Sequence, residues 1–239
     1  MVVVILNSGQ GKRMGELTAQ KPKCLVNLGQ KTILERQLNF LKENNICRII
    51  ITTGPFSRQI RQLTAEKFPE LDISFVHNSL YAETNYIYSL FLTRAFIKED
   101  VLLVHGDLVF GKNVLSQLLN NKFDNMVFVD NKENEKDNDF KAVVKNNEIK
   151  KISTTLEGDN VFPLQPLYKF TEKDFKLWLE EMSFFIEEDK VDNYAEDALN
   201  NLLEEKIRLI PVKINNEFCR EVDNKNDLVE VQKLLERYE

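Results

Sequence analysis

Short apolar runs alternate with helical stretches through the first half of this chain. Strand-like runs occupy residues 2–6, 48–54, 72–78 and 100–107, and helical patterns occupy residues 32–45, 57–68 and 85–96. This alternation favours βαβ units around a mostly parallel sheet, and the run "VLLV" fits a strand buried on both faces. The sequence therefore predicts an α/β, Rossmann-like fold, in which ligands bind at the carboxyl ends of the strands.

The pattern changes after residue 125. A polar run at residues 130–139 is typical of a solvated loop, and residues 140–153 predict a hairpin with Asn146 and Asn147 at its turn. We expect helices at 172–188, 193–205 and 227–238, and strands at 207–214 and 218–222. The prediction is one domain over residues 1–239, with halves at 1–125 and 126–239.

Composition and charge exclude several classes of protein. The formal charge of −6 argues against a nucleic-acid binder, which needs a basic face. The sequence contains no run of about eighteen apolar residues, so it predicts no membrane span. The first residues, "MVVVIL", lack the basic segment of a signal peptide. Three scattered cysteines without metal-binding spacing predict reduced thiols in a cytoplasmic protein.

The loop "NSGQGKRM" at residues 7–14 follows the first predicted strand. Its spacing fits neither a P-loop, because no Ser or Thr follows Lys12, nor a dinucleotide fingerprint, because Met14 stands where a glycine is needed. Residues 1–36 carry a net charge of +4 and the rest of the chain −10. Two glycines that permit close backbone approach, followed by cations, fit a triphosphate. The alternative is a strand–helix connection with solvated lysines.

Five stretches give the chain a family resemblance. They are "LNSGQGKRM", "KPKCLVNLG", "ETNYIYSLFL", "LLVHGDLVF" and "CREVDNKNDL". In this order they resemble the motifs of nucleotidyltransferases that activate sugar phosphates and alcohol phosphates, in the branch similar to bacterial choline-phosphate cytidylyltransferases. The resemblance implies the nucleotide-diphospho-sugar transferase type of fold, a mixed, mostly parallel sheet flanked by helices. Residues 1–125 would form the nucleotide-binding half, and 126–239 a smaller acceptor-side lobe.

The resemblance also implies the reaction and its residues. A phosphate oxygen of the acceptor would attack the α-phosphorus of a nucleoside triphosphate and release pyrophosphate. The nucleophile is already an anion, so the enzyme mainly has to hold two anions together and disperse their charge. Lys23 and Arg13 would be catalytic, at the α-phosphate and the pyrophosphate. The implied nucleotide-binding residues are Asn7, Ser8, Gly9, Gly11, Lys12, Asn85 and Ser89.

Asp107 and Asp223 are the implied ligands of Mg²⁺, which prefers hard oxygen ligands. Each has a structural alternative: Asp107 could be an ordinary turn residue, and Asp223 could cap the last helix.

The stretch "VDNYAEDALNNLL" resembles the part of the choline enzymes that encloses the acceptor. Asp192 and Tyr194 match their pattern, Ala195 stands at a tryptophan position, and Glu196 and Asp197 follow. These carboxylates would favour a cationic acceptor, whereas the missing indole weakens cation–π contacts. The alternative is an amphipathic helix with solvated acids. Trp178 could reach the same pocket or fill the core.

The sequence thus predicts a Mg²⁺-dependent cytidylyltransferase that joins CTP to a small phosphorylated alcohol or amine, phosphocholine first. The alternatives are 2-aminoethylphosphonate or phosphoethanolamine, then a sugar 1-phosphate, as acceptor, and outside this class a nucleotide-binding sensor without activity. We expect neither nucleic acid nor membrane insertion. The sequence does not decide between CTP and UTP, and it does not identify the acceptor or the pathway. It also leaves open the oligomeric state, for which a homodimer is one possibility.

Overall fold

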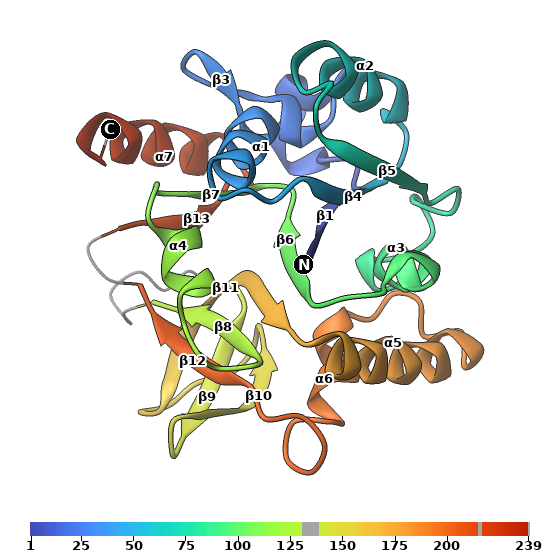
Figure 1. Ribbon diagram of the computed structural model, residues 1–239, viewed down its shortest axis with the longest axis vertical. Coiled ribbons are helices and arrows are strands. Elements are labelled where there is room, and N and C mark those ends of the chain that lie inside the picture. Colours follow the sequence, from blue (N-terminus) through green and yellow to red (C-terminus); the bar gives the residue numbers. More distant parts are fainter. Residues whose placement is uncertain (131–138, 215–216, 239) are drawn as a thin grey trace.

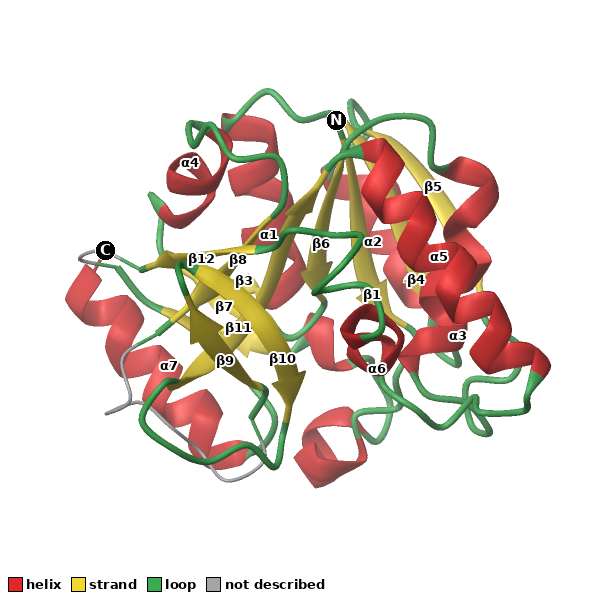
Figure 2. Ribbon diagram, turned by 90° about the horizontal axis from the view of Figure 1, so that it is seen from below, coloured by secondary structure: helices red, strands yellow, loops and turns green. Residues whose placement is uncertain are grey.

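The computed structural model describes residues 1–130, 139–214 and 217–238 of the chain. Its centre is a parallel sheet of four strands in the order β6, β1, β4 and β5 (Figure 2). Their bounds are Val101–His105, Val2–Asn7, Arg48–Thr53 and Asp72–His77. The chain passes from β1 to β4 and β5 on one side and returns to β6 on the other. The predicted parallel sheet is confirmed, and its topological switch point lies between β1 and β6.

Five further strands continue this sheet beyond β6. Long strand β11 pairs antiparallel with β6, and also with β8 and β9. The strands are β8 (Met126–Val129), β9 (Lys141–Lys145), β10 (Glu148–Ser153), β11 (Val161–Phe170) and β12 (Ile210–Lys213). The predicted hairpin is confirmed as β9 and β10, with Asn146 and Asn147 at φ 54° and 60°. Asparagine tolerates this left-handed conformation better than most residues.

Two helical layers cover the sheet because apolar side chains point alternately to its two faces. Val3 and Ile5 pack against one layer, and Val2 and Val4 pack against the other. The first layer comprises α1 (Ile33–Glu43), α2 (Ser57–Lys67) and α4 (Val114–Leu119). The second comprises α3 (Tyr86–Phe91), α5 (Glu172–Glu187) and α6 (Ala195–Asn200), which lie together in Figure 1.

A third, smaller core brings the end of the chain to the first loop. Helix α7 (Lys225–Tyr238) contributes Val231 and Leu235 to a cluster that includes Met14 and Val222. Beside it, β13 (Cys219–Glu221) pairs antiparallel with β7 (Leu108–Phe110). The ladder carries residue 223 to the turn that contains Asp107. Short pieces complete the fold: strands Asn27–Leu28 and Lys31–Thr32, and 3-10 helices Lys12–Thr18, Lys23–Leu25 and Leu92–Phe96.

Some predicted bounds were wrong. The helix expected at 193–205 is only Ala195–Asn200, and the one expected at 85–96 ends as α3 at Phe91 and continues as a 3-10 helix. Strand β11 was not predicted, because prolines such as Pro163 and Pro166 normally argue against a strand. The elements α4, β7 and β8 were not predicted either, because they are short. The polar run at 130–139 lies almost entirely outside the described residues. Among the described helices, none is long and apolar enough to cross a membrane.

Candidate active site

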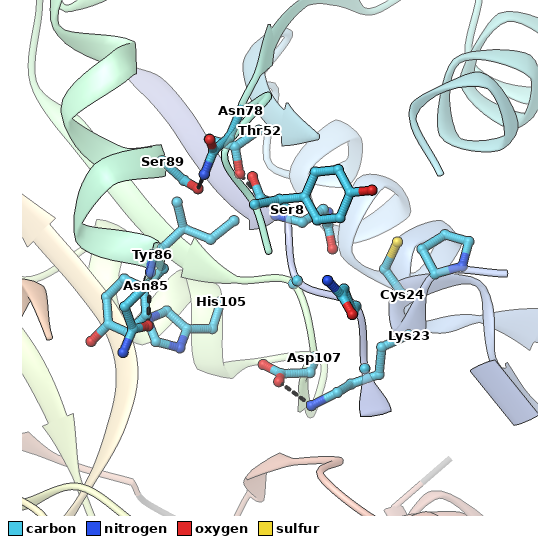
Figure 3. Close-up of a pocket in the computed structure, with 18 of the residues that line it drawn as sticks. Ser8, Lys23, Cys24, Thr52, Asn78, Asn85, Tyr86, Ser89, His105 and Asp107 are labelled. Atoms are coloured by element: carbon cyan, nitrogen blue, oxygen red, sulfur yellow. Dashed lines mark hydrogen bonds and ion pairs between the residues drawn. The ribbon is translucent and has the colours of Figure 1, made fainter. Parts of the chain in front are cut away.

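A cleft of about 400 Å³ opens at the carboxyl ends of β1 and β6, where the sheet topology predicts a ligand (Figure 3). The loop after β1 forms one wall, and residues 81–89 and the turn after β6 form others. Gly106 allows the two strand ends to approach, because a Cβ atom there would overlap the side chain of Asn7. Its amide donates to the carbonyl oxygen of Leu6 at 3.0 Å.

The glycine loop is held in a fixed shape. Gly11 adopts φ 67°, and its carbonyl oxygen accepts a hydrogen bond of 2.7 Å from the Thr18 hydroxyl. A left-handed residue at this point is the ordinary use of glycine. Gly9, in contrast, has open space where a Cβ atom would be, so the protein itself does not require a glycine there. Its absent side chain leaves the backbone accessible from the cleft.

Lys23 lies between two carboxylates from distant parts of the chain. Its Nζ is 2.6 Å from Oδ2 of Asp107 and 2.7 Å from Oδ1 of Asp223, and Nη2 of Arg13 is 2.9 Å from the same Asp223 oxygen. Although burial alone would lower the pKa of Lys23, the two carboxylates raise it above its ordinary value. Burial likewise opposes ionisation of Asp107, but Lys23 holds the pKa of that carboxyl below its usual range. Lys23 and Asp107 are therefore both charged at neutral pH.

The carboxylates of Asp107 and Asp223 converge on one point that already holds a cation. Hard oxygen donors aimed at a common position are what Mg²⁺ requires, with water and phosphate oxygens completing its shell. The carboxylate of Asp223 does not cap α7. Asn224 and Asp227 accept the hydrogen bonds from the backbone amides at the start of that helix, at 2.8–3.2 Å.

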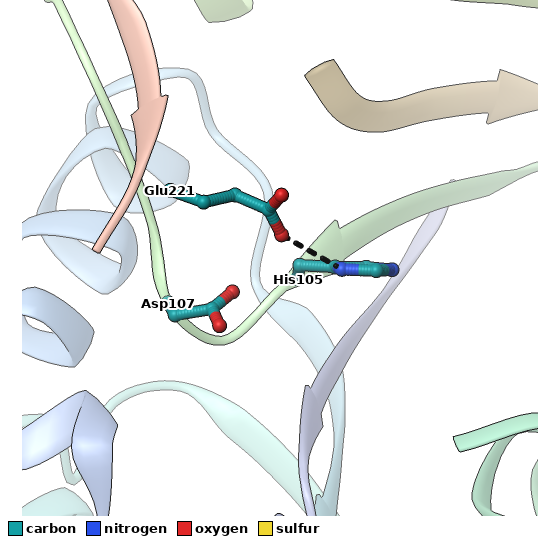
Figure 4. A group of neighbouring side chains, drawn as sticks. All are labelled: His105, Asp107 and Glu221. Carbon is teal, nitrogen blue, oxygen red and sulfur yellow. Dashed lines mark hydrogen bonds and ion pairs between the residues drawn. The ribbon is translucent and has the colours of Figure 1, made fainter. Parts of the chain in front are cut away.

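His105 and Glu221 extend this cluster (Figure 4). Nδ1 of His105 lies 3.2 Å from Oε1 of Glu221, and single atoms of His105, Asp107 and Glu221 all lie within 4.8 Å of one another. Burial and the neighbouring Asp107 charge raise the pKa of Glu221 to about 7, against the effect of His105. Burial lowers the pKa of His105, but the bond to Glu221 outweighs it and raises that pKa overall. Across this contact His105 and Glu221 each favour the charged form of the other.

The inner end of the cleft presents polar groups without partners. Nδ2 of Asn7 and Oγ of Ser8 are buried, line the cleft, and have no hydrogen-bond partner among the described residues. Buried polar atoms are normally paired, so these two are available to a ligand. Ser89 also lines the cleft, and its Oγ accepts 2.9 Å from Nδ2 of Asn78.

Asn85 has a structural task beside any ligand contact. Its Oδ1 accepts from the Tyr86 amide at 2.7 Å, which caps α3, and its Nδ2 donates 3.1 Å to the carbonyl oxygen of Asp192. The backbone amide of Asn85 also donates a hydrogen bond of 2.8 Å to the carbonyl oxygen of Val191. Asn85 therefore ties helix α3 to the loop before α6. Lys12 is exposed and lines the cleft.

A second cavity of about 450 Å³ adjoins the cleft. The two share Arg13, Asn85, Tyr86, His105 and Asp107, so they meet where the charges converge. The second cavity adds Phe140, Thr154, Tyr194, Glu221 and Asp223. The Tyr194 ring lies 5.9 Å from that of Tyr86 and 5.0 Å from that of Phe140, centre to centre.

Of the four residues predicted to bind the acceptor, the structure places only Tyr194 on this cavity. Asp192 is exposed and does not line this cavity, and Oδ2 of Asp197 accepts from the Tyr194 amide at 3.0 Å, at the start of α6. Glu196 is buried behind the wall, where it accepts hydrogen bonds from the hydroxyls of Tyr86 and Tyr168.

Trp178 fills the core: it is fully buried, and its indole donates 2.8 Å to the carbonyl oxygen of Ala195. The helix alternative therefore explains part of this stretch, with Ala198, Leu199, Leu202 and Leu203 buried.

Glu221 and Phe140 are among the residues at this site that the sequence analysis missed, as are Tyr86, His105 and Thr154. Glu221 had a usable signal, because it stands two residues before Asp223 at the end of a strand, and alternate strand residues point to the same face. Phe140 follows a long polar run and begins the hairpin, which gave no indication of its position.

Residues 3–176 match the family model of the MobA-like NTP transferase domain. The chain belongs to this family of nucleotidyltransferases. Among curated relatives, it is 34% identical over 110 residues to the choline-phosphate cytidylyltransferase of Streptococcus pneumoniae, covering 46% of each chain. It is 31% identical over 115 residues to the CMP-5'-(3-aminopropyl)phosphonate synthase of Streptomyces rubellomurinus, covering 48% of this chain and 18% of that one. The matches thus span less than half of these relatives' length.

The fold of this nucleotidyltransferase agrees with solved structures over its whole length. The CTP:phosphocholine cytidylyltransferase from Streptococcus pneumoniae superimposes with a TM-score of 0.84 at 23% identity, over 98% of this chain and 99% of that one. The inositol-1-phosphate CTP transferase from T. maritima gives 0.82 at 20% identity, over 99% and 95%. The fold is therefore that of the nucleotide-diphospho-sugar transferases, and CTP-using enzymes are among the relatives.

Proposed function

We propose that this protein is a Mg²⁺-dependent cytidylyltransferase that joins CTP to a small phosphorylated acceptor bearing a cationic nitrogen, and releases pyrophosphate. One observation carries the proposal: Arg13, Lys23, Asp107 and Asp223 converge where the two cavities meet. The cleft at the strand ends would hold the nucleotide, and the second cavity the acceptor. Their phosphates would then meet at the cationic side chains.

The proposed chemistry is a single displacement at phosphorus. An anionic oxygen of the acceptor forms a bond to the α-phosphorus, and the bond from that phosphorus to the oxygen bridging to the β-phosphate breaks. The electron pair leaves with pyrophosphate, and no proton has to move. Lys23 turns from the carboxylates to the α-phosphate, and the exposed Arg13 holds the departing pyrophosphate. Fixed cations at the position of developing charge stabilise the transition state.

Asp107 and Asp223 are the residues that would hold the metal. When bound, Mg²⁺ supplies positive charge that binds phosphate oxygens and lowers their repulsion toward the incoming acceptor. The backbone of the glycine loop adds amide donors beside the triphosphate, and the unpaired Asn7 and Ser8 side chains are available to the cytidine.

The second cavity favours a cationic acceptor. The rings of Tyr86, Phe140 and Tyr194 provide aromatic walls, and Glu221 provides a carboxylate. Aromatic faces attract ammonium groups, whether methylated or not. Two relatives are a choline-phosphate cytidylyltransferase and a CMP-5'-(3-aminopropyl)phosphonate synthase, and the group named in each combines an acidic phosphorus group with a cationic nitrogen. We therefore place phosphocholine first, followed by phosphoethanolamine and 2-aminoethylphosphonate.

One screen tests the proposal. The four nucleoside triphosphates are each combined with phosphocholine, phosphoethanolamine, 2-aminoethylphosphonate, glycerol 3-phosphate and glucose 1-phosphate, and pyrophosphate release is measured with and without Mg²⁺. We expect release with CTP and a cationic acceptor, and none without metal. Release with an uncharged acceptor alone would reject the assignment of the second cavity, and no release with any pair would reject the activity.

A further inference from the structure

The buried amide of Gln37 holds the turn that carries Asp107. Gln37 lies on α1 and is only 2% exposed. Its Nε2 donates to the carbonyl oxygens of His105 at 2.9 Å and Leu108 at 2.8 Å. These carbonyls flank Gly106 and Asp107, so one side chain spans the whole turn between β6 and β7.

Backbone contacts fix other sides of the same turn. The amide of Gly106 donates to Leu6 on β1, and the amide of Val222 donates to the carbonyl oxygen of Asp107, both at 3.0 Å. The second bond joins the segments that carry Asp107 and Asp223. Gln37 adds a connection from the helical layer, so that the turn is held against α1 as well as against its neighbouring strands.

The side-chain oxygen of Gln37 indicates that the two hydrogen bonds donated by its Nε2 are needed. Its Oε1 is buried and has no hydrogen-bond partner among the described residues. The neighbouring buried residues of α1 include Leu34, Leu38 and Leu41, so an apolar side chain would fit this helix face. An amide with an unpaired oxygen is costly to bury. Packing alone therefore does not explain a glutamine at this position.

We infer that Gln37 is a positioning residue for the metal site, because it sets the direction in which the Asp107 carboxylate points. The inference rests on the proposed function, in which Asp107 holds Mg²⁺. Without the two donated bonds, the turn can tilt away from Lys23 and Asp223, and the two carboxylates no longer converge. Loss of groups that orient metal ligands typically weakens metal affinity by about 10- to 100-fold.

Binding of Mn²⁺ in the presence of CTP and without acceptor tests this inference, with free Mn²⁺ measured by electron paramagnetic resonance. Gln37→Met keeps the length of the side chain and removes both donors, and Gln37→Glu keeps its shape but cannot donate both hydrogen bonds. Both should bind Mn²⁺ at least tenfold more weakly than the unaltered protein. Asn125→Leu is the matched control, because Asn125 is a buried amide that bonds to Arg208 and Thr171 away from the site.

The control should lose thermal stability and keep its Mn²⁺ affinity. A folded Gln37 variant of either kind that binds Mn²⁺ within twofold of the unaltered protein would overturn the inference. Asp107→Asn separates this result from a failure of the proposed function. If Asp107→Asn also binds Mn²⁺ normally, the metal site itself is wrong, whereas its loss beside normal Gln37 variants rejects Gln37 alone.

Discussion

The ammonium group of Lys23 lies 2.6 Å from the carboxylate of Asp107, although 84 residues separate them in the chain. With Asp223 on its other side, the lysine holds together two acids that would otherwise repel each other. The arrangement places a cation where we propose that Mg²⁺ binds, and keeps Lys23 within reach of both cavities. Metal binding and the release of Lys23 toward the nucleotide would then be one coupled event.

Replacing Lys23 by alanine should mainly slow the chemical step. Loss of a preorganised contact to the developing charge commonly costs about 10²–10³ in rate, which single-turnover measurements with CTP and acceptor detect. Lys21→Ala is the matched control, because Lys21 lies two residues away and lines neither cavity. Turnover of Lys23→Ala within a few-fold of normal would remove the lysine from the mechanism.

The same variant should also respond differently to metal. Without Lys23, two partly buried carboxylates face each other with less compensation, so Mg²⁺ should raise the melting temperature of Lys23→Ala more than that of the unaltered protein. Melting curves over a Mg²⁺ series provide the measurement. Equal shifts in the two proteins would mean that lysine and metal do not compete for the carboxylates.

Variants of Asp223 and Asp227 distinguish the binding of a metal ion from the capping of helix α7. Asp223→Asn should abolish Mg²⁺-dependent turnover with little loss of stability, because its carboxylate faces Lys23 and Arg13. Asp227→Ala should destabilise the protein by roughly 1 kcal/mol, since Asp227 accepts from the amides of Asp223 and Asn224. It should keep most of its activity. Activity that survives in Asp223→Asn would exclude Asp223 as a metal ligand.

The parallel sheet, and the positions of the first loop and of Asp107 at its strand ends, could be predicted from the sequence because local patterns determine them. Alternating apolar runs indicated the parallel strands, and a strand that ends in Gly106-Asp107 must place its acid at the crevice. Nothing local indicated that β13 pairs with β7, over a separation of about a hundred residues. The position of Asp223 therefore came from family resemblance and not from the residues themselves.

The stretch 192–197 shows that charge alone does not predict where a side chain lies in the fold. Three acids in the stretch 192–197 looked equivalent in sequence, yet one is exposed, one starts a helix, and one is buried against two tyrosine hydroxyls. Which of these occurs depends on where α6 meets the sheet, and that is a tertiary contact. The acids that line the second cavity are instead Asp107, Glu221 and Asp223, and its aromatic rings include those of Tyr86, Phe140 and Tyr194.

The three thiols should differ sharply in reactivity. Cys47 is exposed, whereas Cys24 and Cys219 are buried, and burial raises the pKa of both. Since the thiolate is the reactive form, one equivalent should react quickly with a disulfide reagent, and two more only after denaturation. Cys47→Ser should remove the fast phase. A second fast thiol that CTP protects would instead show that Cys24 is accessible from the cleft.

Glu35 should make stability depend on pH in acid. Burial tends to raise its pKa, but Lys67 and Thr32 bind the carboxylate and lower the pKa overall. A carboxyl pKa that is lower in the folded state than in the unfolded state stabilises the fold at pH values above the unfolded-state pKa of about 4.3. This contribution disappears as the pH falls through the lower folded-state pKa. Glu35→Gln should lower the melting temperature by about 2–4 °C at pH 7 and by less at pH 3. An equal difference at both values would contradict this assignment.

The aromatic walls of the second cavity should discriminate between ammonium groups. A trimethylated nitrogen cannot donate hydrogen bonds and depends on aromatic faces, whereas a primary amine can also bind a carboxylate. Phe140→Ala should therefore raise the Michaelis constant for phosphocholine by about 3- to 30-fold, and that for phosphoethanolamine by less. The constant for CTP should stay nearly unchanged, because Phe140 does not line the nucleotide cleft. Asp192→Asn is the matched control, since Asp192 is exposed outside the cavity, and it should leave both acceptors unaffected. A larger effect of Asp192→Asn than of Phe140→Ala would place the acceptor against the loop before α6 and away from the aromatic cavity.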